Sequence, residues 1–265
     1  MSIARSCRCV RLPRSCWYAP LVNWAERDAP VIHYLNQLVE RHPRWGQDKC
    51  VARSRTDKKV WNHKRLRRVY RKMGLNQPRR TKKRLPARDA MPLFVPSSPN
   101  MVWSADFMSD ALYHGSRFRT FNLIDDFARE ALAIEIDTSL RADRILRVFE
   151  QLKTERPLPD VIRVDNGPEF LSDTFTDWMT RHGVMVQYIE PGKPNQNAYI
   201  ERFNRTYREE VLNLYLFQSL NEVRDITSKW LTDYNELRPH DSLNGLSPAS
   251  FLKNHSRLSG SELSV

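Results

Sequence analysis

The sequence lacks long apolar runs, and this shortage limits the class of protein that it encodes. No run approaches the roughly 20 apolar residues of a membrane-spanning helix, and residues 1–20 lack the uninterrupted apolar core of a secretory signal. The content of 40% hydrophobic and 28% charged residues is typical of globular domains, and no segment repeats. We therefore expect a cytoplasmic protein with no membrane partner and one large or two modest domains.

Cysteine is also scarce, and neither serine nor histidine forms a catalytic cluster. The four cysteines, Cys7, Cys9, Cys16 and Cys50, all lie in the first fifth of the chain. They have no pair-of-pairs spacing for zinc, and a disulfide framework would leave the rest of the chain without a crosslink, so we expect free thiols. No serine has neighbours that support serine-based recombination, and the histidines, including His240, show no ligand spacing.

Positive charge is abundant and unevenly distributed. Residues 1–100 contain 24 Lys and Arg against 6 Asp and Glu, a net charge of +18, whereas residues 101–265 contain 19 against 25, a net charge of −6. Such a concentration of positive charge attracts nucleic acid through phosphate neutralisation and counterion release. The alternative is a solvated basic surface or a disordered basic tail with no nucleic-acid partner.

Residues 1–75 are expected to form a small basic helical DNA-binding module. Apolar residues recur at helical spacing over 29–43 and again over 62–75, where Gly74 is a typical helix stop. Residues 51–60 have no apolar stripe between these helices, so we expect the module to be partly irregular there.

Two groups of basic residues are candidate DNA contacts. The first lies opposite the apolar stripe of the second helix, where it would read bases or bind only the phosphate backbone. The second lies in the linker expected at 76–100, which holds five prolines and no sustained period. The candidates are Lys64, Arg65 and Arg68 on the helix, and Arg79, Arg80, Lys82, Lys83 and Arg84 in the linker.

Residues 101–252 have the pattern of a mixed α/β domain. Three strand-like runs come first, within 101–136, and a helix at 141–155 follows. Strand, helix, strand and helix then alternate, and an amphipathic helix at 220–238 closes the domain. We therefore expect a mixed sheet flanked by helices, followed by a flexible tail over 253–265.

Three acidic residues fall where such a sheet brings its elements together. Asp106 lies within the first strand, Asp165 at the end of the fourth, and Glu201 in the helix after the fifth. Magnesium prefers oxygen ligands, so we expect these carboxylates to lie within bonding reach of one metal site. The spacing alone is weak evidence, because the 25 acidic residues of this half supply many chance triples. Asp165 also fits a helix cap on its local sequence.

The residues around Glu201 offer further DNA contacts. Lys193 lies in the preceding proline-rich loop, and Arg205 and Arg208 follow Glu201 at i+4 and i+7 on one helix face. An ordinary surface salt bridge between Glu201 and Arg205 is the alternative.

Three more acidic residues lie near the expected site. Asp125 and Asp126 end the second strand; they would assist a metal or, in our interpretation, serve as turn or cap residues. Glu169 either supports the site or is an ordinary acid in a first helical turn.

Four ordered motifs resemble the catalytic frame of bacterial insertion-sequence transposases related to retroviral integrases. They are VWSADF (102–107), RVDNGPEF (163–170), PGKPNQNAYIERFNRTYREEVL (191–212) and YNELRPHDSLNGLSPASF (234–251). The resemblance is closest to the IS-three class, in its second-reading-frame (OrfB-type) product. It covers about residues 100–252, and parts of the basic N-terminal region are similar to that class as well.

The resemblance implies a DDE transposase with a ribonuclease H-like core. In that family Asp106, Asp165 and Glu201 are catalytic and hold two Mg²⁺ ions, for which Mn²⁺ substitutes. Water first cleaves DNA at the element's end and frees a 3′-hydroxyl, which then attacks a phosphodiester without a covalent protein intermediate. The implied partners are the element's ends and target DNA, a first-reading-frame protein or a fused form, and further copies of the chain on the nucleoid.

Two other functions stay open on the sequence. The irregularity expected at 51–60 would suit an inactive or regulatory DNA-binding fragment of such a transposase. A ribonuclease H-like nuclease that cuts without joining would carry the same carboxylates.

Overall fold

A five-stranded mixed sheet forms the centre of the larger domain. The computed structural model describes residues 2–19, 23–76, 94–190 and 197–261. The strands are β1 (Val102–Ala111), β2 (Arg117–Asp125), β3 (Glu130–Asp137), β4 (Val161–Val164) and β5 (Met185–Tyr188). Their order is β3-β2-β1-β4-β5, with β1 to β3 antiparallel and β1, β4 and β5 parallel. The mixed sheet that the sequence predicts is confirmed.

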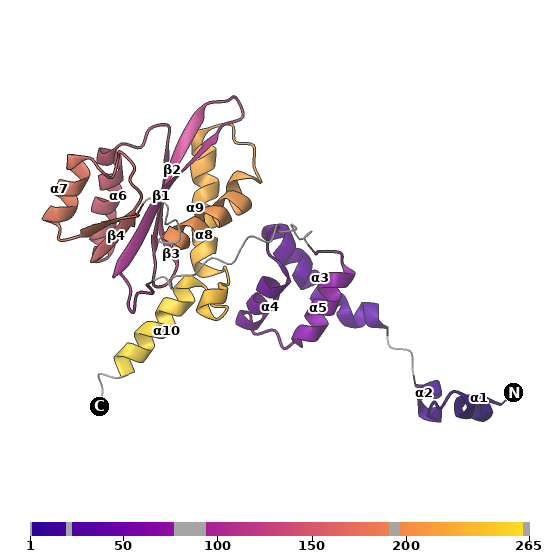
Figure 1. Cartoon of the computed structure of the whole chain (residues 1–265). Helices are drawn as coiled ribbons and strands as arrows, with labels where there is room; N and C mark the ends of the chain where they lie inside the picture. Colours follow the sequence, from indigo (N-terminus) through magenta and orange to yellow (C-terminus); the bar gives the residue numbers. More distant parts are fainter. Residues whose placement is uncertain (1, 20–22, 77–93, 191–196, 262–265) are drawn as a thin grey trace.

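Helices cover both faces of this sheet (Figure 1). One face packs against α6 (Ala142–Glu155) and α7 (Asp173–Arg181), and the other against α8 (Ala198–Tyr207), the π-helical turn η2 (Arg208–Leu212) and α9 (Leu220–Glu236). Alternate side chains of β1 point to opposite faces. Trp103 and Ala105 join the core under α6 and α7, whereas Met108 packs with η2. Asp106, two residues before Met108, therefore faces α8.

A three-helix module precedes the sheet. It consists of α3 (Trp24–Arg41), α4 (Gln47–Thr56) and α5 (His63–Lys72), after two short helices, α1 (Ile3–Cys9) and α2 (Arg14–Tyr18). Leu35 and Val69 are buried in its core. The side chains of Asn23 and Asn62 cap α3 and α5 by accepting backbone hydrogen bonds, and Gly74, with a φ of 69°, follows the end of α5. Both helices that the sequence predicts here are present.

The expectation of an irregular segment at 51–60 is wrong over much of that range, because α4 continues to Thr56. The helix buries Cys50, Val51 and Ser54, which are small or polar and form no apolar stripe. The buried Ser54 hydroxyl donates to the Val51 carbonyl oxygen at 2.8 Å, so it retains a hydrogen bond. Tertiary packing therefore decides the conformation where periodicity does not.

Helix α10 (Pro248–Ser261) extends into the range where we expected a flexible tail, 253–265. Phe251 and His255 both pack against the ring of Phe127, at centroid distances of 5.4 and 4.9 Å. These contacts anchor the helix to the turn between β2 and β3, and a short 3₁₀ turn, η3 (Asp241–Leu243), precedes it. No described helix combines the length and the apolar character needed to cross a membrane.

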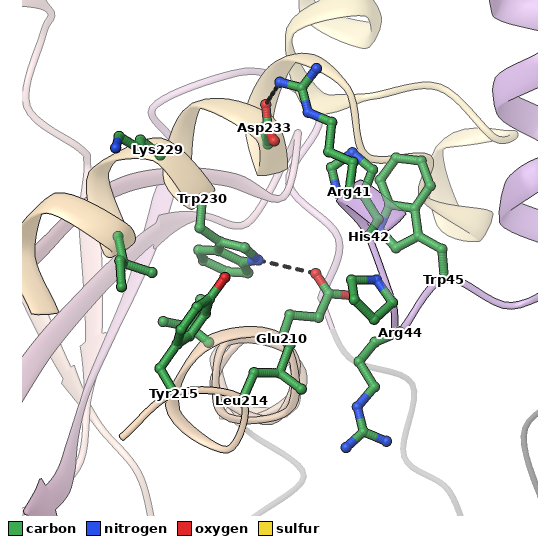
Figure 2. A pocket seen from close by; sticks show the side chains of 13 residues that line it. Arg41, His42, Arg44, Trp45, Glu210, Leu214, Tyr215, Lys229, Trp230 and Asp233 are labelled. Carbon is green, nitrogen blue, oxygen red and sulfur yellow. Dashed lines mark hydrogen bonds and ion pairs between the residues drawn. The ribbon is translucent and has the colours of Figure 1, made fainter. Parts of the chain in front are cut away.

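The helical module contacts the larger domain at a junction around Glu210. The Glu210 carboxylate accepts a hydrogen bond from Arg238 at 2.8 Å and lies 3.7 Å from the Lys49 amine of α4. A second ion pair joins Arg41 of α3 to Asp233 of α9 at 3.2 Å. Figure 2 shows Arg41 and Asp233 facing each other beside a cavity of about 280 Å³. Both sides of the junction thus contribute charged groups.

Candidate active site

Asp106 lies in β1 on the face that α8 covers, and a chain of amides holds its carboxylate. Oδ1 accepts the backbone N–H of Phe107 at 2.8 Å, and Oδ2 accepts the side-chain amide of Asn204 at 2.7 Å. The amide of Asn122, the register partner of Asp106 on β2, donates to Asn204 Oδ1 at 2.6 Å. These linked hydrogen bonds fix the orientation of the Asp106 carboxylate.

Asp165 directly follows the last residue of β4. The parallel register pairs Ser104 with Arg163, and the same offset places Asp165 beside Asp106. The Asp165 carboxylate accepts the backbone N–H of Gly167 at 3.1 Å, which closes a tight turn. Both strands therefore deliver an acid to one edge of the sheet.

The alternative interpretation of Asp165 as a helix cap is wrong. The cap of α7 is Ser172, whose hydroxyl accepts the backbone N–H of Phe175 at 3.4 Å. Gly167 has a different role in the turn. A Cβ at this position would lie 3.0 Å from Asp165 Oδ1 and 3.4 Å from Glu169 Oε2, so glycine leaves room for two carboxylates.

Glu201 lies in the first turn of α8, on the side of the helix that faces Asp106. It precedes Asn204 by three residues, so the two side chains share a face, and Asn204 touches Asp106. Glu201 is exposed and lines a cleft of about 540 Å³. It forms no ion pair with another described residue.

The three carboxylates affect one another without forming a closed cluster. The pKa of Asp106 is raised to about 6, first by burial and then by the negative charges of Asp165 and Glu201. Within the described ranges, no three His, Cys, Asp or Glu side chains stand close enough together to hold a metal ion. The charges of Asp165 and Glu201 thus reach Asp106, and the role of the three acids as metal ligands stays a prediction.

Two of the three basic candidates on α5 are engaged inside the helical module. Arg65 and Arg68 pair with Asp28 of α3 at 3.1 and 2.8 Å, and the Asp28 side chain is only 3% exposed. Burial acts to raise the pKa of Asp28, but the hydrogen bonds and charges of the two arginines outweigh it and lower the pKa. Lys64 is exposed and has no ion pair in the described part of the chain.

The other predicted DNA contacts differ in whether their side chains already have partners within the protein. Arg205 is exposed and unpaired among the described residues. Arg208 donates to Asp110 at 3.3 Å and to the Ser109 carbonyl at 3.0 Å, so its guanidinium is held against β1. The remaining candidates lie outside the described residues: Arg79, Arg80, Lys82, Lys83, Arg84 and Lys193.

The acids at the end of β2 have structural roles. Asp125 accepts the backbone N–H groups of Asn100 at 2.7 Å and Phe127 at 2.8 Å, which confirms its interpretation as a turn residue. Asp126 is fully buried and pairs with Arg163 at 3.0 Å, a role that we did not predict.

Sequence reasoning also missed the amides around Asp106 and the partner of Glu169. The signal for Asn204 was its position three residues after Glu201, on the same helix face. The signal for Asn122 was a polar residue between two apolar ones, Phe121 and Leu123. Glu169 pairs with Arg119 of β2, whose guanidinium lies 4.3 Å from the Phe107 ring centroid.

Known proteins match this chain over both of its parts. A family model described as an integrase core domain matches residues 96–194, and another with the same description matches residues 182–248. The uncharacterized 39.2 kDa protein of insertion element IS476 from Xanthomonas euvesicatoria is 36% identical over 256 residues, which cover 96% of this chain and 73% of that protein. The 31.7 kDa protein of IS407 from Burkholderia multivorans is 36% identical over 255 residues, with coverage of 96% and 92%.

More distant matches agree with these. The putative transposase InsK of IS150 from Escherichia coli is 22% identical over 261 residues and covers 92% of this chain and 91% of its own length. The structure of the simian T-cell lymphotropic virus intasome has a TM-score of 0.50 at 14% identity, over 83% of this chain and 74% of that chain, and it supports the fold alone.

These matches agree with the mixed sheet and the helices that cover both of its faces. An integrase core domain brings with it DNA binding, oligomerisation and dependence on a divalent metal. The chain belongs to the bacterial insertion-sequence transposases with an integrase core domain, and it is a DDE transposase, a polynucleotidyl transferase with a ribonuclease H-like fold.

Proposed function

We propose that Asp106, Asp165 and Glu201 are the catalytic carboxylates of this transposase. The observation that carries the proposal is that a strand pairing and a hydrogen bond bring the elements that carry these three residues together. The β1–β4 register sets Asp165 beside Asp106, and the Asn204 amide ties Asp106 to the helix that carries Glu201. Elements far apart in the sequence thus supply oxygen donors on one side of the sheet.

The donor set fits divalent magnesium, and we propose two such ions, for which manganese substitutes. Hard cations take carboxylate oxygens, and the charges of Asp165 and Glu201 both raise the pKa of Asp106, so negative charge is concentrated where such ions would bind. Asp106 and Asp165 would hold them from the sheet and Glu201 from α8. When bound, the ions stabilise the attacking and leaving oxygens of a phosphoryl displacement.

The reaction that we propose has two steps on DNA. Water cleaves a phosphodiester at the end of the insertion sequence and frees a 3′-hydroxyl, which then attacks a phosphodiester of the target. In the joining step one P–O bond forms while another breaks, so neither an external energy source nor a covalent bond to the protein is needed. In addition to the catalytic carboxylates, we propose that two exposed basic residues, Lys64 and Arg205, contact DNA phosphates.

The partners that we propose follow from this reaction. Two DNA ends must meet for insertion, which favours a homo-oligomer assembled on the element's ends. A first-reading-frame protein or a fused form would supply further recognition of those ends. DNA as the substrate would place the protein in the cytoplasm, at the nucleoid. An inactive DNA-binding fragment loses its main support, because α4 is a helix where the sequence suggested irregularity.

The proposed function predicts metal-dependent cutting and joining of DNA. We expect the wild-type protein, supplied with the first-frame protein, to cleave and join labelled DNA that carries the element's ends in Mg²⁺ or Mn²⁺. We expect no product in EDTA, because the carboxylates then lack the cations. Denaturing gels measure both products. Binding without cleavage would contradict the proposal, and cleavage without joining would favour the nuclease alternative.

Asn204 is a positioning residue in this scheme, and Asn204→Leu tests it. The substitution keeps the size of the side chain but removes the amide that holds Asp106. We expect cleavage to slow by about 10- to 100-fold, because a misplaced catalytic group costs that order of rate. We also expect half-maximal cleavage to require more Mg²⁺, since the Asp106 carboxylate is no longer oriented.

Asn213→Leu provides the matched control, because Asn213 is exposed and follows η2 away from the carboxylates. It should leave both the rate and the Mg²⁺ requirement unchanged. An unchanged Mg²⁺ requirement in a folded Asn204→Leu protein would show that the amide has only a structural role.

A further inference from the structure

A strongly basic cleft opens beside Glu201, where the helical module meets the larger domain. We define the basic cleft by its five cationic side chains: Lys49, Arg129, Arg202, Arg205 and Arg238. Lys49 comes from α4, Arg129 from the turn between β2 and β3, the next two from α8, and Arg238 follows α9. Among the described residues, two carboxylates, Glu201 and Asp241, line the same space of about 540 Å³.

The cations of the basic cleft divide into held and free groups. Arg238 is fixed on Glu210 at 2.8 Å, which also lies 3.7 Å from Lys49, so one carboxylate serves two cations. Arg129 lies over the ring of Tyr199, 3.4 Å from its centroid. Arg202 and Arg205 are exposed and have no ion pair within the described residues. The cleft therefore retains positive charge that its own acids do not neutralise.

The pKa values of two residues that line the cleft, His240 and Lys49, are lowered in part by these positive charges. Burial lowers the pKa of His240 to about 3, and the charges of Arg238, Lys49, Arg129 and Arg202 act in the same direction. Burial likewise lowers the pKa of Lys49 to about 8, with Arg238 as the next cause. Burial is the main cause in both cases, and the neighbouring cations add to it.

The chemistry of the basic cleft suits phosphates better than bases. Its aromatic rings offer little surface for base stacking, because Arg129 already lies over Tyr199 and both Phe203 and Tyr234 are buried. Its donors are guanidinium and ammonium groups from four separate parts of the chain, which match the oxygens of a nucleic-acid backbone. Glu201 lines the cleft, so a strand in the cleft would pass beside this proposed catalytic carboxylate.

We propose that the basic cleft holds backbone phosphates of the DNA strand at the catalytic carboxylates, and that Lys49 makes the helical module part of this binding site. The inference rests on the proposed function, because it takes Glu201 as the neighbouring catalytic group. It adds that the helical module, through Lys49, and the larger domain, through Arg129 and Arg202, bind the same stretch of the DNA backbone.

DNA binding in EDTA tests this inference separately from catalysis. We expect Arg202→Ala to weaken binding of a labelled duplex about fivefold at about 0.1 M salt, and to reduce the slope of log affinity against log salt by about one. Fluorescence anisotropy gives both values. Arg147→Ala is the matched control, because Arg147 is an exposed arginine on α6, across the sheet, and its loss should change neither value.

Lys49→Met tests the contribution of the helical module. We expect a similar loss of affinity and of salt slope. Because Lys49 also lies near Glu210, Glu210→Gln serves as a companion variant: it disturbs the same junction but leaves both cations in the cleft. We expect Glu210→Gln to bind DNA at least as tightly as the wild type. Weakened binding by Glu210→Gln would assign the effect of Lys49→Met to the junction and overturn the module's role.

The outcomes separate this inference from the proposed function. If Arg202→Ala and Lys49→Met bind DNA as Arg147→Ala does, the inference is wrong even where the wild type cuts and joins DNA. If the wild type fails to cut while these variants lose affinity, only the proposed function falls.

Discussion

We expect Glu201→Gln to lower the rates of DNA cleavage and joining by about a thousandfold or more, while DNA affinity stays within about twofold of the wild type. Glutamine has nearly the same shape as glutamate, so the variant removes the charge without opening a cavity. Glu201 is exposed and has no ion pair with another described residue, so the fold should not depend on its charge. What is lost is a charged oxygen donor, which is worth several kcal/mol in a metal-assisted displacement.

Glu209→Gln is the control for this experiment. Glu209 is an exposed glutamate in η2, two turns beyond Glu201, and the substitution makes the same change of charge. We expect wild-type rates from it. Gel assays give the rates, anisotropy the affinity, and thermal melting the fold. A Glu201→Gln protein that keeps more than about a tenth of the wild-type rate at saturating Mg²⁺ would rule out Glu201 as a catalytic carboxylate.

The largest effect on stability is expected from Arg163→Met, at about 3–5 kcal/mol in the free energy of unfolding at pH 7. Arg163 lies in β4 with only 6% of its side chain exposed, and it pairs with the fully buried Asp126 at 3.0 Å. Ser104 donates to the same oxygen at 2.8 Å, but the other oxygen of Asp126 has no partner in the described part of the chain. Removal of the guanidinium therefore leaves a buried carboxylate with one neutral hydrogen bond.

The loss of stability should depend on pH. The pKa of Asp126 is raised from an ordinary 3.8 to about 6, chiefly by burial, with Arg163 acting in the opposite direction. A carboxyl whose pKa is higher in the folded state favours folding below its unfolded pKa, and this contribution disappears as pH rises through the folded value. Without Arg163 the folded pKa rises further. We therefore expect the variant's deficit to be smaller at pH 5, where Asp126 is protonated, than at pH 7.

Urea unfolding at the two pH values measures this effect. Arg147→Met, which removes an exposed arginine, should change the free energy of unfolding by less than about 0.5 kcal/mol. The double variant Asp126→Asn with Arg163→Met should recover part of the loss, because no buried charge remains. A deficit in Arg163→Met that is equal at pH 5 and pH 7 would show that lost packing, not the unpaired Asp126, causes the destabilisation.

Patterns with strong periodicity were sufficient to predict most of the larger domain. The strand at 161–164 follows from its run of apolar residues, and the register then carries Asp165 to Asp106. Helix α4 escaped prediction because its buried face is made of Cys50, Val51 and Ser54, whose burial depends on α3 and α5 rather than on any stripe of their own.

Polar pairs between distant residues were beyond the reach of the sequence. The sequence of α5 predicts a DNA-binding surface on its basic face, yet Arg65 and Arg68 form ion pairs with Asp28 of α3. Asp126 reads as a turn residue, yet it meets Arg163 across the sheet. In each case one residue type suits two roles, and only the packing of helices or strands decides between them.

The junction around Glu210 has a consequence for how such genes exchange parts. A hybrid gene joined in the linker would set one protein's α3 and α4 against another protein's Asp233 and Glu210. Unless both sides carried matching charges, the hybrid would lose the pairs that seat Lys49 and Arg41. Viable crossovers should therefore fall before α3 or after residue 248, so the unit that is inherited intact is longer than the integrase core domain itself.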